Sequence, residues 1–186
     1  ASALRAQDNL VNVNMVKLPK QVNFSASQFR PFFTGDEESV YFTAKIGNNE
    51  DVFVSSKDST GVWKKAVEFG NKINTKYNEG FVTVSADGHV MVYASTKPRG
   101  YGKSDLYISY LEQGEWSIPR NMGSEINCGG YDSEPALTAD GKGMYYSSTR
   151  KGGIGGKDIW YVKLHSKDDW GKPINLGREV NTSGDE

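Results

Sequence analysis

Three aspartates occupy the same place in three related stretches of the sequence. Asp51, Asp105 and Asp158 each open an apolar run, DVFVS, DLYIS and DIWYV. A carboxylate at such a point can accept backbone N–H groups from its own loop, or several carboxylates together can hold Ca²⁺, which prefers oxygen ligands. Because a unique site needs residues that differ between copies, their repetition favours the structural role. We therefore predict no metal or cofactor site, with Ca²⁺ as the one alternative left open.

The segments before Asp105 and Asp158 are rich in glycine and could be mistaken for phosphate-binding loops. They lack the GxxxxGK[ST] pattern and do not lead into a helix, so no helix N-terminus is available to bind an anion. Loops carry binding residues disproportionately often, and aromatic and cationic side chains suit contacts with a peptide, protein or glycan. The candidates for such contacts are Arg99, Tyr101, Lys103, Arg150 and Lys151. The alternative is that these side chains are solvated loop tips.

The sequence contains no pattern typical of a catalytic site. Its two histidines, His89 and His165, match no metal-ligand spacing, and no Ser-His-Asp or Cys-His arrangement stands out. The single Cys128 excludes an internal disulfide and is expected to be a small buried or half-buried thiol. Residues Ser56–Trp63 (SKDSTGVW) resemble the Asp-box of sialidases with one extra residue, and that box is a structural hairpin. We predict no catalytic residue and no enzymatic activity.

These residues belong to a repeat of about fifty residues. An apolar stretch ending in a β-branched residue and Asn recurs at Asn23, Asn74, Asn127 and Asn181, with spacings of 51, 53 and 54. A near-constant period in this range indicates one supersecondary unit per repeat. Asp-Gly pairs at positions 87–88 and 140–141 are typical of tight hairpin turns. The first copy has Asp36-Glu37 instead and is expected to turn less tightly.

Each copy contains four short apolar runs, as expected for four antiparallel strands. A tryptophan at Trp63, Trp116 or Trp170 is predicted to start the fourth strand of its copy. Neighbours of the bulky residues in MYYSS and VMVYAS are also apolar or small, which suits strands covered on both faces. The predicted fold is therefore all-β, a β-propeller of four-stranded antiparallel blades. About three blades are present, and the ring is incomplete within this chain.

The repeat also sets the expected boundaries. Residues 1–15 are assigned to an N-terminal arm, and the blades to about 24–74, 75–127 and 128–181. Residues 16–23 are expected to supply the outer strand of a preceding unit. Residues 182–186 (TSGDE) are expected to form the entrance to a further blade, because SGDE matches YDSE at the start of the third copy. Since closed propellers have about four to eight blades, missing blades or another chain are expected to close the ring.

Composition excludes some classes of partner. The 186 residues carry a formal net charge of −1, so no strong field attracts nucleic acid or an anionic membrane. The 37% hydrophobic and 24% charged fractions lie in the globular range. No apolar stretch is long enough to span a bilayer, and the N-terminus lacks the apolar region of a signal peptide. We predict no nucleic-acid partner and no membrane span.

The third copy, SEPALTADGKGMYYSSTRKGGIGGKDIWYVKL followed by WGKPINLGREVNTSGDE, resembles the WD40-like repeat of TolB-type propellers. It is similar in particular to repeats in OmpA-family envelope proteins of Bacteroidetes, some of which serve type IX secretion or gliding assemblies. The resemblance covers roughly residues 16 to 186. It implies a periplasmic or outer-membrane-associated protein. No OmpA-like domain is present in the sequence, so peptidoglycan binding is not implied.

Two functions remain open from the sequence. The first is a non-catalytic propeller module of a bacterial cell-envelope protein, which binds a protein or glycan partner. The second is a fragment of a propeller enzyme, such as a glycoside hydrolase, a lyase or a peptidase-associated propeller, with active residues outside this chain. A neighbouring OmpA-like or helical-repeat domain in the parent protein would favour the first, and a hydrolase domain the second.

Overall fold

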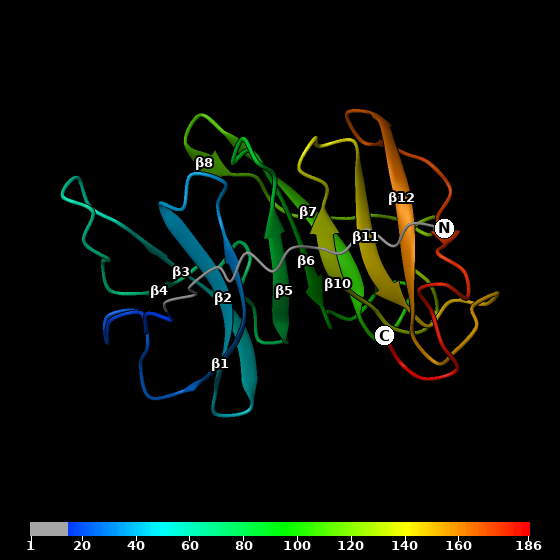
Figure 1. Cartoon of the computed structure of the whole chain (residues 1–186), viewed down its shortest axis with the longest axis horizontal. Coiled ribbons are helices and arrows are strands. Elements are labelled where there is room, and N and C mark those ends of the chain that lie inside the picture. Colours follow the sequence, from blue (N-terminus) through cyan, green and yellow to red (C-terminus); the bar gives the residue numbers. More distant parts are fainter. Residues whose placement is uncertain (1–14) are drawn as a thin grey trace, which may run out of the picture.

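The computed structural model describes residues 15–186, so the predicted N-terminal arm at 1–15 lies, apart from Met15, outside the described residues. These residues form fourteen strands and contain no helix. The strands make three antiparallel sheets, which lie side by side with β1, β5 and β10 as neighbours (Figure 1). The predicted all-β fold with propeller-type sheets is confirmed. The three sheets do not close into a ring within this chain.

Each sheet follows the order of the chain. The first contains β1 (Ser27–Phe33), β2 (Ser39–Ile46), β3 (Asn49–Ser56) and β4 (Val67–Glu68). The second contains β5 (Glu79–Val84), β6 (Val90–Ser95) and β7 (Asp105–Glu112), and both β8 (Glu115–Trp116) and β9 (Arg120–Asn121) pair with β7. The third contains β10 (Asp132–Leu137), β11 (Gly143–Ser148) and β12 (Asp158–Ser166), and both β13 (Asp169–Trp170) and β14 (Ile174–Asn175) pair with β12.

The fourth strand of each unit is thus short and, in the second and third sheets, split in two. Trp116 and Trp170 lie in its first half. In the first sheet, Trp63 makes only an isolated bridge to Lys57, and β4 follows later. Short, interrupted outer strands limit the unpaired edge that a sheet offers to other chains.

The hairpins between the first and second strands share one geometry. Gly88 and Gly141 adopt φ of 75° and 66° and donate their N–H groups to Ser85 and Thr138. Glu37 adopts φ of 57° and donates to the carbonyl of Thr34 at 2.8 Å in the same way. The expectation of a looser first turn is therefore wrong. The Asp36 carboxylate, bonded to the N–H of Glu38, fixes the turn even though Glu37 takes a left-handed conformation that favours glycine.

The repeated asparagine explains the period of the sequence. The Asn74 side chain accepts from the N–H of Val52 and donates to its carbonyl, at 2.9 and 2.8 Å. Asn127 clamps Leu106 in the same two-bonded way, and Asn181 clamps Ile159. A primary amide supplies one donor and one acceptor side by side, which matches the two polar groups of one backbone residue. Each Asn thereby ties the end of its unit to the third strand.

Apolar side chains between the sheets form the core. One cluster, which includes Val52, Ile73 and Tyr93, joins the first and second sheets. Another, which includes Leu106, Ile126 and Trp160, joins the second and third. Ile73 and Ile126 directly precede the clamping asparagines and are 0% and 1% exposed. The turn that closes one sheet therefore packs into the interface with the next.

Residues 16–23 differ from the expected outer strand. They contain a turn in which Val22 and Asn23 donate to the carbonyl of Pro19, and no residue from Met15 to Ala26 lies in a strand. Val22 is 2% exposed and packs with Phe42 and Phe53 of the first sheet, in the position that Ile73 and Ile126 hold later. The segment is a turn because its match to the repeat covers the closing turn of the unit, where the chain is not extended.

The match of SGDE to YDSE is also shifted, by two residues. Thr182 donates its N–H and its hydroxyl to Glu186, as Thr75 does to Glu79, and Lys157 bridges to Asp185 as Ser104 does to Tyr131. Glu186 therefore corresponds to Glu79 and Asp132, five residues after a clamping asparagine.

In the first and second sheets, one face is buried against the next sheet. Within residues 15–186, the corresponding face of the third sheet is exposed. Tyr145 is 42% exposed, whereas the residues in the same register, Tyr41 and Val92, are 9% and 0% exposed. Its ring contacts that of Tyr161 at a centroid distance of 5.0 Å. Val180, in the position of Ile73 and Ile126, is 44% exposed.

Candidate functional site

The ends of the sheets that carry the glycine-rich loops hold most of the predicted site residues. The Asp105 carboxylate accepts the N–H groups of Tyr101 and Gly102 at 2.7 and 2.9 Å, and the amide of Asn121 at 2.8 Å. A side chain on Gly100 would meet this carboxylate, because an added Cβ would lie 1.8 Å from its Oδ2. The glycine is needed so that the loop can close around the aspartate.

Asp158 holds the second glycine-rich loop in the same manner. It accepts from the N–H groups of Ile154 and Gly155 and from the amide of Asn175. Burial alone would raise the pKa of this carboxyl, but these hydrogen bonds to its charged form together lower the pKa below the ordinary value. Asp158 is therefore ionised and occupied by its own loop, as the structural interpretation of the repeated aspartates requires.

Asp51 has no such loop to hold. In the first sheet β2 and β3 are joined by the short hairpin at 47–48, and Asp51 accepts only the side-chain amide of Asn49, at 2.9 Å. The position of Asn121 and Asn175 is taken by Glu68. Among residues 15–186 no three His, Cys, Asp or Glu side chains lie close enough to share a metal ion.

A buried carboxylate with a hydroxyl and a cation lies beside each glycine-rich loop, and the sequence reasoning missed it. In the second sheet Glu79 is 0% exposed and accepts from the N–H and hydroxyl of Thr75 and from the hydroxyl of Ser95. Burial raises the pKa of Glu79 in spite of these bonds. Lys97 lies over the ring of Tyr107, with Nζ 4.7 Å from its centroid. Burial lowers the pKa of Lys97, and the charge of Glu79 opposes this shift.

The third sheet repeats the arrangement with different residues. Asp132, also 0% exposed, accepts the N–H of Cys128 at 2.6 Å and the hydroxyl of Ser148 at 2.5 Å. Burial raises the pKa of Asp132, and Arg150 opposes that shift. The Arg150 guanidinium donates to the carbonyls of Glu125 and Ile126 and lies 5.2 Å from the ring centroid of Trp160.

The first sheet lacks the buried carboxylate, the hydroxyl and the cation at the corresponding positions. Gln28 takes the register position of the carboxylate, Ala44 that of the serine, and Ile46 that of the cation. Gln28 still accepts the backbone N–H of Phe24, at 3.1 Å. A signal for the buried acids was present, because each lies five residues after a clamping asparagine.

The predicted contact residues fall into two groups. Arg99, Lys103 and Lys151 are exposed, and Tyr101 is 51% exposed. Lys103 lies over the ring of Tyr131, with Nζ 5.4 Å from the centroid. Arg150 is only half-exposed, since its guanidinium already binds backbone carbonyls.

Three side chains meet where the innermost strands lie together. Arg30, Phe81 and Glu134 each sit at a β-bulge in β1, β5 or β10 and adopt φ of 55°, 53° and 56°. The left-handed conformation is unfavourable for residues other than glycine, so its occurrence at the same place in three sheets is a feature of the fold. Arg30 pairs with Glu134 at 2.5 Å and lies 5.2 Å from the ring centroid of Phe81.

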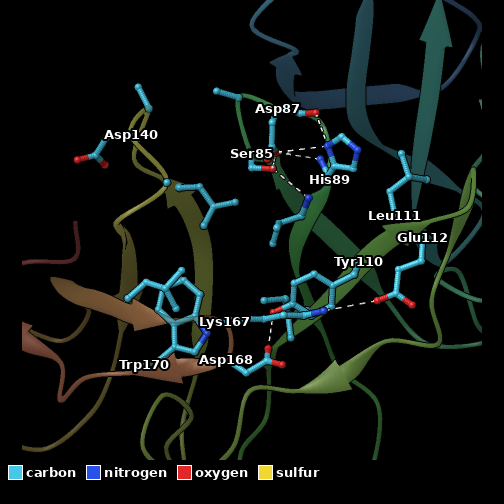
Figure 2. A pocket seen from close by; sticks show the side chains of 17 residues that line it. Ser85, Asp87, His89, Tyr110, Leu111, Glu112, Asp140, Lys167, Asp168 and Trp170 are labelled. Atoms are coloured by element: carbon cyan, nitrogen blue, oxygen red, sulfur yellow. Dashed lines mark hydrogen bonds and ion pairs between the residues drawn. The ribbon is translucent and has the colours of Figure 1, made fainter.

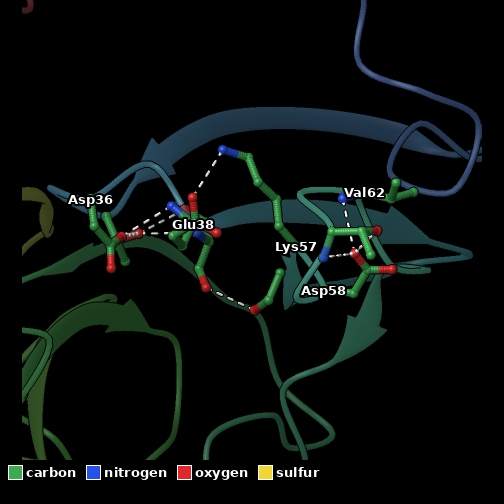
Figure 3. A network of polar contacts seen from close by, with 9 residues as sticks. Asp36, Glu38, Lys57, Asp58 and Val62 are labelled. Atoms are coloured by element: carbon green, nitrogen blue, oxygen red, sulfur yellow. Dashed lines mark hydrogen bonds and ion pairs between the residues drawn. The ribbon is translucent and has the colours of Figure 1, made fainter.

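The segment that resembles an Asp-box forms a turn. The Asp58 carboxylate accepts the N–H groups of Thr60 and Val62 and the hydroxyl of Thr60, and Lys57 pairs with Glu38 at 3.2 Å (Figure 3). These bonds shape the link between β3 and Trp63. They bring no tyrosine or second carboxylate to Asp58, so the segment has the geometry of a structural hairpin.

No protein-family model matches this chain, and no curated protein matches it. Solved structures do resemble it. TolB from Acinetobacter baumannii superposes with a TM-score of 0.54 at 18% identity, over 79% of this chain and 31% of TolB. The β-propeller domain of the Trilobed protease from Pyrococcus furiosus gives 0.51 at 13% identity, over 82% and 43%.

A thermostable family-43 glycoside hydrolase gives a TM-score of 0.50 at 14% identity, over 80% of this chain and 53% of the hydrolase. The chain thus spans less than two thirds of the length of each of these structures. At these identities the likeness concerns the fold alone. The chain has the β-propeller fold, of the kind found in TolB.

Proposed function

We propose that this chain is a non-catalytic β-propeller module that binds a protein or glycan partner through its glycine-rich loops. The observation that carries the proposal is that acidic side chains and loop side chains at this end of the molecule differ in burial. The acids Glu79, Asp132, Asp105 and Asp158 are buried and hydrogen-bonded within the fold. Within the glycine-rich loops themselves, the charged and aromatic side chains that are exposed are Arg99, Tyr101, Lys103 and Lys151.

These exposed residues define what we call the loop surface: Arg99, Tyr101, Lys103, Tyr131 and Lys151. Tyr101 and Tyr131 are 51% and 45% exposed, and Lys103 covers one face of Tyr131. Tyrosine and arginine supply much of the binding energy at protein interfaces, and lysines favour an anionic partner. An acidic protein segment or an acidic glycan suits this chemistry best.

The setting that we propose is the bacterial cell envelope, in the periplasm or at the outer membrane. The support is the resemblance of the repeats to those of OmpA-family envelope proteins, which also suggests an assembly of the type IX secretion or gliding kind. No helix that could span a membrane occurs between residues 15 and 186.

We also propose that a further sheet, from the same protein or another chain, covers the exposed face of the third sheet. Tyr145, Tyr161 and Val180 hold positions that adjacent sheets bury elsewhere in this molecule. Light scattering is expected to show association of the isolated chain, and Tyr145→Lys is expected to abolish it. A compact monomer would contradict this part of the proposal.

The test of the loop surface uses immobilised polygalacturonate and an acidic peptide as anionic probes, with dextran as the neutral control. The unaltered chain is expected to bind at least one anionic probe and to bind it more weakly at high salt. The double variant Tyr101→Ala/Lys103→Ala should weaken binding about tenfold, and Lys142→Ala, at the other end of the sheets, should not. Binding that is absent for both probes, or equal for the two variants, would overturn the proposal.

The alternative is a fragment of a propeller enzyme, and a propeller is present both in the protease and in the glycoside hydrolase that resemble this fold. In that alternative, Arg30, Glu134 and Phe81, which converge at the innermost strands, would complete a site together with active residues outside this chain. Turnover of aryl glycosides by the purified chain, lost in Glu134→Gln, would favour the enzyme and overturn the non-catalytic proposal.

A further inference from the structure

A groove of about 480 Å³ opens between the second and third sheets, at the hairpin end opposite the loop surface (Figure 2). Its floor is apolar and comes from both sheets. The side chains that form this floor are Val90, Ile108, Leu137, Leu164 and Trp170. The volume lies within the range of clefts that bind small groups, which is about 300–1,000 Å³.

The hairpins of neighbouring sheets explain why the groove opens here. Between the first and second sheets the hairpins lie close together, because a Cβ added to Gly35 would be in ordinary van der Waals contact with the carbonyl of Ala86, at 3.7 Å. Between the second and third sheets the corresponding hairpins stand apart, and Ala86 and Ala139 both line the groove. The side chain of Ala86 occupies the position at which Gly35 has none.

The other wall is held by polar contacts across the two sheets. Tyr110 donates its hydroxyl to Asp168, and Arg120 pairs with Asp168 at 2.5 Å. Burial, together with the hydrogen bond to Asp168, raises the pKa of Tyr110, so the phenol remains a donor. Lys167 lies 4.9 Å from the ring centroid of Tyr110 and 3.6 Å from Glu112. Contacts between side chains therefore fix this wall, and its cations Arg120 and Lys167 are already paired with carboxylates.

The mouth of the groove is acidic. Asp87 and Asp140 come from the two hairpins and both line the groove (Figure 2). The hydroxyl of Ser85 lowers the pKa of Asp87, and that of Thr138 lowers the pKa of Asp140, so both are ionised. Their hydrogen bonds all use Oδ1, which leaves each Oδ2 without a partner among residues 15–186.

We propose that this groove binds a peptide segment in which an apolar side chain stands next to lysine or arginine. The apolar side chain would enter the floor between Leu137 and Ile108, and the cation would meet Asp87 and Asp140 at the mouth. The basis is charge complementarity. Of the four carboxylates that line the groove, Glu112 and Asp168 pair with Lys167 and Arg120, which leaves Asp87 and Asp140 to meet a cation of the ligand.

The test titrates the ¹⁵N-labelled chain with the capped peptide Lys-Phe-Lys and follows backbone amide shifts. Saturable shifts are expected at His89, Gly141 and Asp168. The capped peptide Glu-Phe-Glu should give none, and neither should phenethylamine at equal concentration. Asp87→Asn/Asp140→Asn should weaken binding of Lys-Phe-Lys about tenfold, since asparagine keeps the turn contacts but removes both charges.

The matched control is Asp36→Asn, which makes the same change in the hairpin of the first sheet, away from the groove. It should bind Lys-Phe-Lys as the unaltered chain does. Equal binding of Glu-Phe-Glu, or unchanged affinity in the double variant, would overturn the proposal. Binding of phenethylamine without the peptide would also overturn it, because the ligand would then be a small amine. All of these outcomes are independent of the loop surface, which lies at the other end.

Discussion

The first and third sheets share one backbone plan but differ in the chemistry of their loop ends. The N–H of the residue after the repeated asparagine (Asn23 or Asn127) is accepted by the amide oxygen of Gln28 in the first sheet and by the carboxylate of Asp132 in the third. The backbone therefore needs an acceptor but no charge. Serine, arginine and a glycine-rich loop accompany the charge in the third sheet and are missing from the first.

The comparison indicates that the buried negative charge is needed by the loop end and its cation, and not by the backbone. A buried carboxylate costs desolvation energy, which a neutral amide largely avoids. Its presence in the second and third sheets coincides with Lys97 and Arg150, which cover aromatic rings below the glycine-rich loops. The two sheets that carry the exposed loop surface are thus the two that have the buried acids.

The largest expected effect comes from removing one of these acids. Asp132→Ala should lower the free energy of unfolding by about 3 kcal/mol, because it leaves the N–H of Cys128 and the hydroxyl of Ser148 without their acceptor and removes the negative charge near Arg150. Gln28→Ala, at the same position of the first sheet, should cost about 1 kcal/mol. Urea unfolding measures both, and equal losses would show that the two positions do not differ.

The aspartates at the start of the third strands should differ in the same direction. Asp158→Ala should cost about 2 kcal/mol, since two loop N–H groups and the amide of Asn175 lose their acceptor. Asp51→Ala, which loses one side-chain contact, should change stability by less than about 0.5 kcal/mol. Hydrogen exchange should accelerate at residues 152–156 in the first variant alone. Unchanged exchange there would contradict the role of Asp158.

A pH series tests the buried charge of the second sheet. The pKa of Glu79 is raised by burial, so the folded protein keeps this proton at pH values at which the unfolded chain has lost it. Its contribution to stability is therefore greatest below the ordinary pKa of 4.5 and falls as the pH rises through the folded pKa. Relative to the unaltered protein, Glu79→Gln should gain about 1 kcal/mol between about pH 4 and pH 7.

The reverse exchange is the control for that series. Gln28→Glu places a carboxyl beside Ala44, without the hydroxyl or cation of the other sheets. It should lose stability as the pH rises over the same range. A parallel pH profile for the two variants would mean that the environment of Glu79 does not raise its pKa.

The smallest effect concerns the hairpins. Glu37→Gly should stabilise the protein by about 0.5–1 kcal/mol, because glycine adopts φ of 57° without the steric cost that glutamate carries. Gly88→Glu makes the opposite change in the second sheet and should lower the melting temperature. A loss of stability in Glu37→Gly would show that the Glu37 side chain makes a compensating contribution.

The sequence was sufficient to predict the all-β propeller fold, because the period, the Asp-Gly turns and the tryptophans are local signals of one repeated unit. It failed at the first turn and at residues 16–23, where tertiary contacts and register decide the conformation. The bulges at Arg30, Phe81 and Glu134 carry no turn signature, and the groove depends on the distance between two hairpins. Neither is encoded in the period of apolar residues.

The packing of Ile73 and Ile126 has a consequence for protein engineering. Each belongs by sequence to one sheet, yet its buried surface lies against the next. A unit cut at the sheet boundaries would leave that side chain in water and open a gap in its neighbour's core. Modules exchanged between such proteins should therefore begin near the glycine before the turn, at Gly70 or Gly123. Each transplanted sheet then carries the isoleucine that packs against it.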